Sequence, residues 1–130
     1  PMLIKNVSVR TKKNHVETEV FLDAYCADCG CYLAQSVILS SDPGIIACEM
    51  TAGVPGEKVL TCADAVPAIV STKENPVSYD LVTKLFDAKD SLIDENRCNF
   101  QFTLPHDASD SGRKSNGTLV SKIKEIFAGK

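Results

Sequence analysis

The sequence predicts an α+β fold with an N-terminal β-hairpin, an antiparallel meander sheet and a C-terminal helix. Residues 98–104 place apolar and polar side chains at alternating positions, which is the pattern of a half-buried strand. Residues 3–10 and 16–22 alternate in the same way on either side of a polar turn, which indicates a hairpin. In residues 118–127 the apolar side chains instead follow the spacing of an amphipathic helix.

The length and composition predict a single domain over residues 1–130. Hydrophobic residues make up 44% of the chain, and no apolar run approaches the length that spans a membrane. The formal net charge is −3, so a nucleic-acid partner would have to be held by local basic positions on one surface. Because the chain begins at Pro1, as after removal of an initiator Met, and shows no signal peptide, we expect a soluble cytoplasmic protein with no membrane partner.

The predicted β elements follow one another along the chain. The N-terminal hairpin occupies residues 1–24, and the antiparallel sheet extends over residues 32–104. Its alternating runs are separated by turn signals such as Asp42-Pro43-Gly44. The expected strands of this sheet cover residues 32–39, 45–50, 58–62, 68–73, 78–86 and 98–104.

Residues 78–86 fit two kinds of secondary structure. Their apolar positions also satisfy helical spacing, and Asn75-Pro76 could begin a helix, so the period alone does not decide. The preceding run, residues 68–73, ends at a turn of hairpin length, which favours a strand. Strands at 68–73, 78–86 and 98–104 would together make a meander.

Residues 115–128 are predicted to form the closing helix. Residues 115–118 supply its N-cap, and the basic and acidic side chains of residues 122–125 lie on the face opposite the apolar one. The apolar face consists of Leu119, Val120, Ile123, Ile126 and Phe127.

The cysteines suggest a small zinc-binding interaction module as an alternative. Cys26-x-x-Cys29-x-Cys31 contains the knuckle turn with which zinc ribbons place two thiolates. Cys48 and Cys62 would have to bring the other ligands from separate strands, because the sequence has no second Cys-x-x-Cys and no His pair. The competing interpretation is that these are buried or loop thiols, with no cofactor.

The sequence does not support catalysis, and we expect no enzyme. An N-terminal Pro1 can act as a general base in tautomerases, but those proteins place a helix after the first strand, where this chain has a hairpin. His15 and His106 stand alone in polar segments, without a recognisable nucleophile. A Gly-rich phosphate loop is also missing.

The second half of the chain resembles the coat proteins of the small single-stranded RNA bacteriophages, the leviviruses. A strand ending in Ser-x-Lys at residues 71–73 is followed by a strand that reads Tyr-x-x-x-x-Lys-hydrophobic at residues 79–85. The variable loop of these coats resembles residues 87–96, and their following strand resembles residues 98–104. The helix of residues 118–127 stands where these coats also place one.

The resemblance implies a levivirus-like capsid protein, found in the virion and, before assembly, in the host cytoplasm. Two copies would pair edge to edge as a homodimer, the C-terminal helix would pack on the partner subunit's sheet, and dimers would close into an icosahedral shell. The inner sheet face would bind single-stranded genomic RNA, and in this family the same face typically binds an operator hairpin and so represses replicase translation. The expected RNA-binding residues are Ser71, Lys73, Lys84, Asn99 and Gln101.

Overall fold

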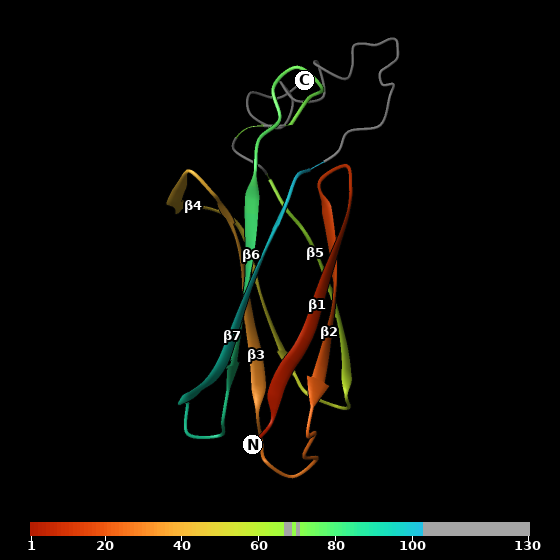
Figure 1. Ribbon diagram of the computed structural model, residues 1–130, viewed down its shortest axis with the longest axis vertical. Helices are drawn as coiled ribbons and strands as arrows, with labels where there is room; N and C mark the ends of the chain where they lie inside the picture. Colours follow the sequence, from red (N-terminus) through yellow and green to blue (C-terminus); the bar gives the residue numbers. More distant parts are fainter. Residues whose placement is uncertain (67–68, 70, 103–130) are drawn as a thin grey trace.

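The structure is a computed structural model that describes residues 1–66, 69 and 71–102, and this part of the chain contains seven β-strands (Figure 1). In chain order they are β1 (Leu3–Lys12), β2 (His15–Asp23), β3 (Tyr32–Leu39), β4 (Asp42–Gly53), β5 (Lys58–Asp64), β6 (Tyr79–Phe86) and β7 (Leu92–Phe100). No helix long and apolar enough to cross a membrane occurs within these ranges.

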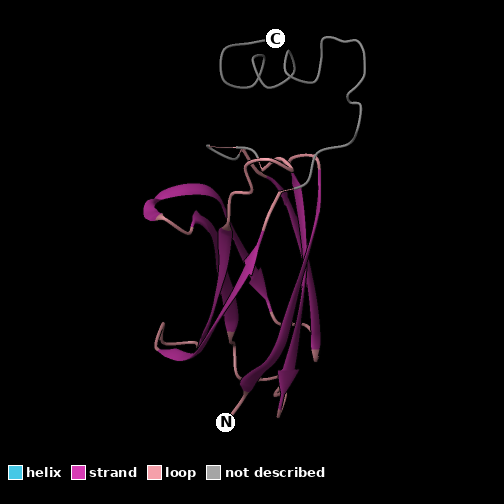
Figure 2. Ribbon diagram, turned by 45° about the horizontal axis from the view of Figure 1, so that its top comes forward, coloured by secondary structure: helices cyan, strands magenta, loops and turns pink. Residues whose placement is uncertain are grey.

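The strands form two antiparallel sheets that lie face to face as the layers of a sandwich (Figure 2). One sheet has the strand order β1-β2-β5, and the other has the order β4-β3-β6-β7. The first strand, β1, lies beside the last, β7, where the backbone nitrogen of Ile4 donates to Asp94 Oδ2 at 2.9 Å. This contact satisfies a backbone donor at the rim of the sandwich.

The predicted α+β fold class is therefore wrong. The described ranges are all strand and turn, without a helix, and the expected single sheet over residues 32–104 is divided, because β5 pairs with β2 in the other layer. The predicted helix at residues 115–128 lies outside the residues that the structure describes.

Several local predictions agree with the structure. The N-terminal hairpin is present as β1 and β2, and residues 78–86 are confirmed as strand, since they form β6. The strand expected at residues 68–73 is wrong, because residues 71–73 are not strand. The variable loop expected over residues 87–96 is shorter, because β7 already begins at Leu92.

Alternating apolar side chains explain why two sheets stack. On each strand every second side chain faces inward, where burial of a Val or Leu contributes about 1.5–3 kcal/mol. The central strands β2, β3 and β6 supply most of this core, including Val16, Val20, Leu33, Val37, Leu81 and Leu85, each fully buried.

A buried polar network joins the two sheets at the centre of the sandwich. Gln35 on β3 donates from Nε2 to Thr18 Oγ1 and to Thr83 Oγ1, both at 3.1 Å. Its Oε1 accepts from Thr61 Oγ1 at 2.7 Å, and the hydroxyls of Thr61 and Thr18 lie 2.6 Å apart. Because strands of both layers contribute, the network fixes the position of one sheet relative to the other.

Tyr79, at the start of β6, anchors the long connection that precedes this strand. Its buried ring meets Phe102 edge to face, with centroids 5.0 Å apart. Its hydroxyl accepts from the backbone nitrogen of Ile69 at 2.9 Å and donates to the carbonyl of the same residue. This contact resembles the tyrosine corner of other β-sandwiches, in which a Tyr near the start of a strand bonds back to the backbone upstream.

Candidate functional site

The expected RNA-binding residues do not gather in one place. Lys84 and Asn99 lie on the outer face of the four-stranded sheet, where Lys84 is paired in register with Glu95 and Asn99 with Asp80. Gln101 is exposed just beyond the end of β7.

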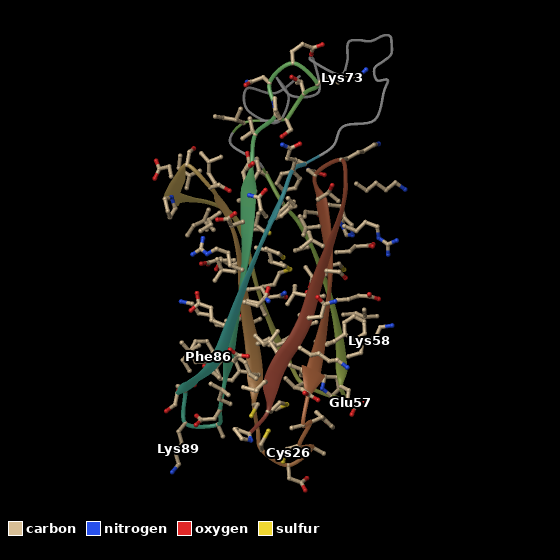
Figure 3. The ribbon with its side chains drawn as sticks, viewed as in Figure 1. Cys26, Glu57, Lys58, Lys73, Phe86 and Lys89 are labelled. Carbon is tan, nitrogen blue, oxygen red and sulfur yellow. The ribbon has the colours of Figure 1, made fainter. Side chains whose placement is uncertain are left out.

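The other two expected residues belong to the connection between β5 and β6. Ser71 is buried. Its hydroxyl donates to the carbonyl oxygen of Val77 at 2.6 Å and accepts from the backbone nitrogen of Val77 at 2.7 Å. Ser71 therefore holds a turn together. Lys73 is exposed at the end of the sandwich opposite the turn that carries Lys89 (Figure 3).

The outer face of the four-stranded sheet carries mixed charge. The registers of β3, β4, β6 and β7 place two cations there, Lys84 and Arg97, against three carboxylates, Glu49, Asp80 and Glu95. A phosphate backbone is bound by surplus positive charge, which this face does not have.

Asp80 is the centre of a hydrogen-bond cluster on this face. Its carboxylate accepts from Arg97 Nη1 at 2.8 Å, from Ser40 Oγ at 2.9 Å and from Asn99 Nδ2 at 3.0 Å. Partial burial opposes ionisation of Asp80, but these bonds, led by the one from Asn99, outweigh it and lower its pKa. Asn99 is thus occupied in a structural contact that its place in the sequence did not indicate.

Replacing Asp80 by Asn should lower the free energy of unfolding by about 1–2 kcal/mol near pH 7. Because folding lowers the Asp80 pKa, its contribution is complete above the unfolded pKa and is lost as pH falls through the folded pKa. Urea unfolding should therefore show the difference near pH 7 and little of it near pH 3. The exposed Glu95→Gln on the same face is the matched control, and an equal loss at both pH values for Asp80→Asn would contradict the pKa argument.

The five cysteines proposed as an alternative zinc site are not brought together. Cys48 lies on β4, where burial raises the pKa of its thiol, and Cys62 is exposed on β5 in the other sheet. Within the described ranges no three His, Cys, Asp or Glu residues form a group able to hold a metal ion. Cys26, Cys29 and Cys31 share the loop between β2 and β3, at the end of the sandwich marked by Cys26 in Figure 3.

Cys29 and Cys31 form a close pair within that loop. Cys29 Sγ donates to Cys31 Sγ at 2.7 Å, and it also lies 3.2 Å from the carbonyl oxygen of Cys26. When Cys29 is deprotonated the Cys31 thiol becomes the donor, and this hydrogen bond lowers the pKa of the Cys29 thiol. Burial, followed by the same hydrogen bond, raises the pKa of the Cys31 thiol to about 11.

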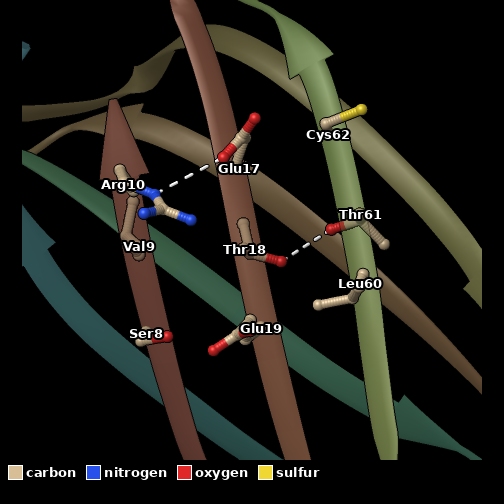
Figure 4. Close-up of a pocket in the computed structure, with 9 residues that line it drawn as sticks. All are labelled: Ser8, Val9, Arg10, Glu17, Thr18, Glu19, Leu60, Thr61 and Cys62. Atoms are coloured by element: carbon tan, nitrogen blue, oxygen red, sulfur yellow. Dashed lines mark hydrogen bonds and ion pairs between the residues drawn. The ribbon is translucent and has the colours of Figure 1, made fainter. Parts of the chain in front are cut away.

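A shallow hollow of about 530 Å³ lies on the outer face of the three-stranded sheet (Figure 4). Figure 4 shows its side chains projecting from β1, β2 and β5. Leu60 on β5 is 65% exposed there, beside the exposed thiol of Cys62. We call this surface, comprising Arg10, Glu17, Glu19, Leu60 and Cys62, the Leu60 face.

Charged side chains lie beside Leu60 on the same outer face. Arg10 Nε lies 3.5 Å from Glu17 Oε1, and Lys58 Nζ lies 3.5 Å from Glu19 Oε2. His15 Nε2 also lies 3.3 Å from Glu17 Oε2. The side chains of the Arg10–Glu17 and Lys58–Glu19 pairs are all more than one-third exposed, so each of these two ion pairs contributes less than about 1 kcal/mol and rearranges at little cost.

The exposure of Leu60 could have been predicted from the alternation of side chains along its strand. In the run Lys58-Val59-Leu60-Thr61-Cys62, the inward phase is set by Val59, which is buried. Leu60 then falls in the outward phase, between Lys58 and Cys62. The alternation therefore exposes Leu60 on the outer face of the sheet, where a partner could cover it.

Comparisons with known proteins give structural likeness only. No family model matches the chain, and no curated protein matches it either. A β-glycosidase from Bacteroides vulgatus is similar over 78% of this chain and 13% of its own, with a TM-score of 0.60 and 15% sequence identity. A β-glucuronidase from Bifidobacterium dentium is similar over 78% and 18%, with a TM-score of 0.58 and 13% identity.

A glycosyl hydrolase family 2 member from Bacteroides cellulosilyticus also resembles the chain, over 78% of this chain and 14% of its own, with a TM-score of 0.55 and 16% identity. At these identities the likeness shows the sandwich fold. The chain spans less than a fifth of the length of each of these proteins.

Proposed function

We propose that this chain is a non-catalytic β-sandwich module that docks through its Leu60 face against another domain of a larger carbohydrate-active protein. The observation that carries the proposal is the 65% exposure of Leu60 in a hollow that charged side chains of β1 and β2 also line. Interfaces between domains likewise combine apolar and polar side chains. Covering Leu60 would remove the largest exposed fraction among the large apolar side chains of the described ranges from water.

The kind of partner follows from the structural likeness. In the three glycosidases named above, the matching unit makes up 13–18% of the chain, so there it is one portion of a much larger protein. A portion of that kind contacts its neighbours through an interface of about 600–1,500 Å², which one face of a small sheet can supply. The partner we propose is therefore a neighbouring domain of the same polypeptide.

The exposed thiol of Cys62 makes this proposal testable, because it sits next to Leu60. In the full-length gene product, alkylation of Cys62 by iodoacetamide should be at least about tenfold slower than in the 130-residue chain, since docking covers the thiol. Peptide mass spectrometry after timed labelling measures the rate. Substitution Leu60→Asp in the full-length protein should restore fast labelling of Cys62.

Cys26 is the matched control, because it is also exposed but lies in the loop between β2 and β3, away from the Leu60 face. Its labelling rate should be the same in both proteins. Equal Cys62 rates in the two proteins would contradict the docking proposal, and so would a gene that encodes no further domain.

The shell protein with an RNA-binding face stays a prediction, as do its virion location and the zinc module. One feature favours self-association. β4 is a twelve-residue edge strand of its sheet, and it exposes Ile45 and Ile46. An open strand edge is a template for pairing with a second chain, so β4 is the place where two copies would join.

A further inference from the structure

We infer that Cys29 and Cys31 form a reversible dithiol site that reacts with low-molecular-weight disulfides and closes to an intrachain disulfide. The two sulfur atoms already lie 2.7 Å apart, and a disulfide bond requires about 2.05 Å. The sulfur–sulfur separation is therefore well under 1 Å from bonding distance. The site is independent of the Leu60 face, because it lies in the loop between β2 and β3.

The backbone around the pair is held in a conformation that keeps the two thiols together. Gly30, between them, has a φ of 70°, which non-glycine residues rarely adopt. A Cβ at this position would lie 3.0 Å from the Cβ of Ala88, so the glycine also permits close contact with the turn between β6 and β7. The loop between β2 and β3 is therefore packed against the turn between β6 and β7.

That turn is itself rigidly built. Asp87 Oδ1 accepts from the backbone nitrogens of Lys89, at 2.8 Å, and Ser91, at 3.0 Å. Directly after the thiol pair, the Tyr32 hydroxyl donates to Asp90 Oδ1 at 2.7 Å. The Cys29 to Tyr32 segment therefore contacts the turn at two separate points, which limits the entropy lost when the disulfide forms.

The two thiols differ in accessibility, which assigns their roles. Cys29 is partly exposed, so a small disulfide can reach its sulfur atom. Cys31 is buried in the core, in one cluster with Leu33 and Leu85. Cys29 is thus the attacking residue, and Cys31 is the resolving residue.

The reaction consists of two thiol–disulfide exchanges. The Cys29 thiolate attacks one sulfur of a small disulfide, forms a mixed disulfide and releases the other half as a thiolate. Cys31 then loses its proton and attacks Cys29 Sγ, which expels the second small thiolate. The two cysteines are oxidised by two electrons, the small disulfide is reduced to two thiols, and a small dithiol reverses the sequence.

The test uses oxidised glutathione on the folded chain, followed by alkylation of the remaining thiols and mass spectrometry under non-reducing conditions. The wild type should lose the mass of two hydrogen atoms in the peptide that contains Cys29 and Cys31, with no glutathione retained at either of these two cysteines. Cys31→Ser should instead accumulate the glutathione mixed disulfide at Cys29. Cys29→Ser should react at this site at least about tenfold more slowly, because the remaining thiol is buried.

Two controls separate the pair from the other thiols. Cys62→Ser should leave closure unchanged, and wild-type Cys62 should retain glutathione, because it has no resolving neighbour. Cys26→Ser should also close. Retention of glutathione at Cys29 in the wild type, or loss of closure in Cys26→Ser, would overturn the assignment, and thermal unfolding of each variant shows whether it is folded.

Discussion

Replacing Gln35 by Leu should lower the free energy of unfolding by about 2–4 kcal/mol, although the new side chain is apolar and of similar size. Gln35 is 2% exposed and bonds to hydroxyl groups from both sheets. Without it, Thr83 Oγ1 loses its partner inside the core, where an unpaired hydroxyl keeps its full desolvation cost. Urea unfolding followed by circular dichroism measures the loss.

A compensated variant distinguishes lost hydrogen bonds from altered packing. Gln35→Leu combined with Val at the three threonine positions, Thr18, Thr61 and Thr83, removes both partners of every bond in the network. Because replacing all partners by apolar groups of the same shape is nearly neutral, this variant should regain most of the stability. If Gln35→Leu alone were within about 0.5 kcal/mol of the wild type, the network would have no role in stability.

Tyr79→Phe should destabilise the fold by about 1–3 kcal/mol. The substitution retains the ring and its edge-to-face contact with Phe102, and it removes only the hydroxyl that bonds to both backbone groups of Ile69. Loss of these bonds frees the connection between β5 and β6 from the core. Thermal unfolding should show the lower stability, and limited proteolysis should show faster cleavage before β6.

Tyr32→Phe is the matched control, since it also deletes one hydroxyl and keeps the ring stacked on Phe86, with centroids 5.2 Å apart. The Tyr32 hydroxyl bonds to the exposed Asp90, where water can replace it, so the change should cost less than about 0.5 kcal/mol. Equal effects of the two substitutions would mean that the corner contributes nothing beyond an exposed hydrogen bond.

The alternation of side chains predicted the strands but not their partners. The N-terminal hairpin joins neighbours in sequence, so its pairing could be inferred from a short turn. The partner of β5 is β2, with β3 and β4 between them in the chain, and no local pattern encodes that choice. The second layer was also difficult to infer because two of its contact residues, Thr18 and Gln35, are polar although they are buried.

The candidate sites were predictable only in part. Lys84 and Asn99 do share the outer face of the four-stranded sheet, but the hydrogen bonds of Asn99 with Asp80 and Ser40 depend on contacts between β7, β6 and the turn that follows β3. The loop cysteines were evident from their spacing. Their pairing was not, because it depends on the backbone at Gly30 and on its contact with Ala88, a residue distant in sequence.

The pairing of β2 with β5 also governs how the chain must fold. The chain passes from one layer to the other after β2, again after β4 and again after β5, so neither sheet can be completed from a continuous half of the sequence. Closure of such non-local contacts is slow, typically milliseconds to seconds for all-β sandwiches. Until β5 pairs with β2, β2 has an open edge and the Thr18 hydroxyl lacks its hydrogen bond with Thr61. We therefore expect the two layers to assemble in one cooperative event.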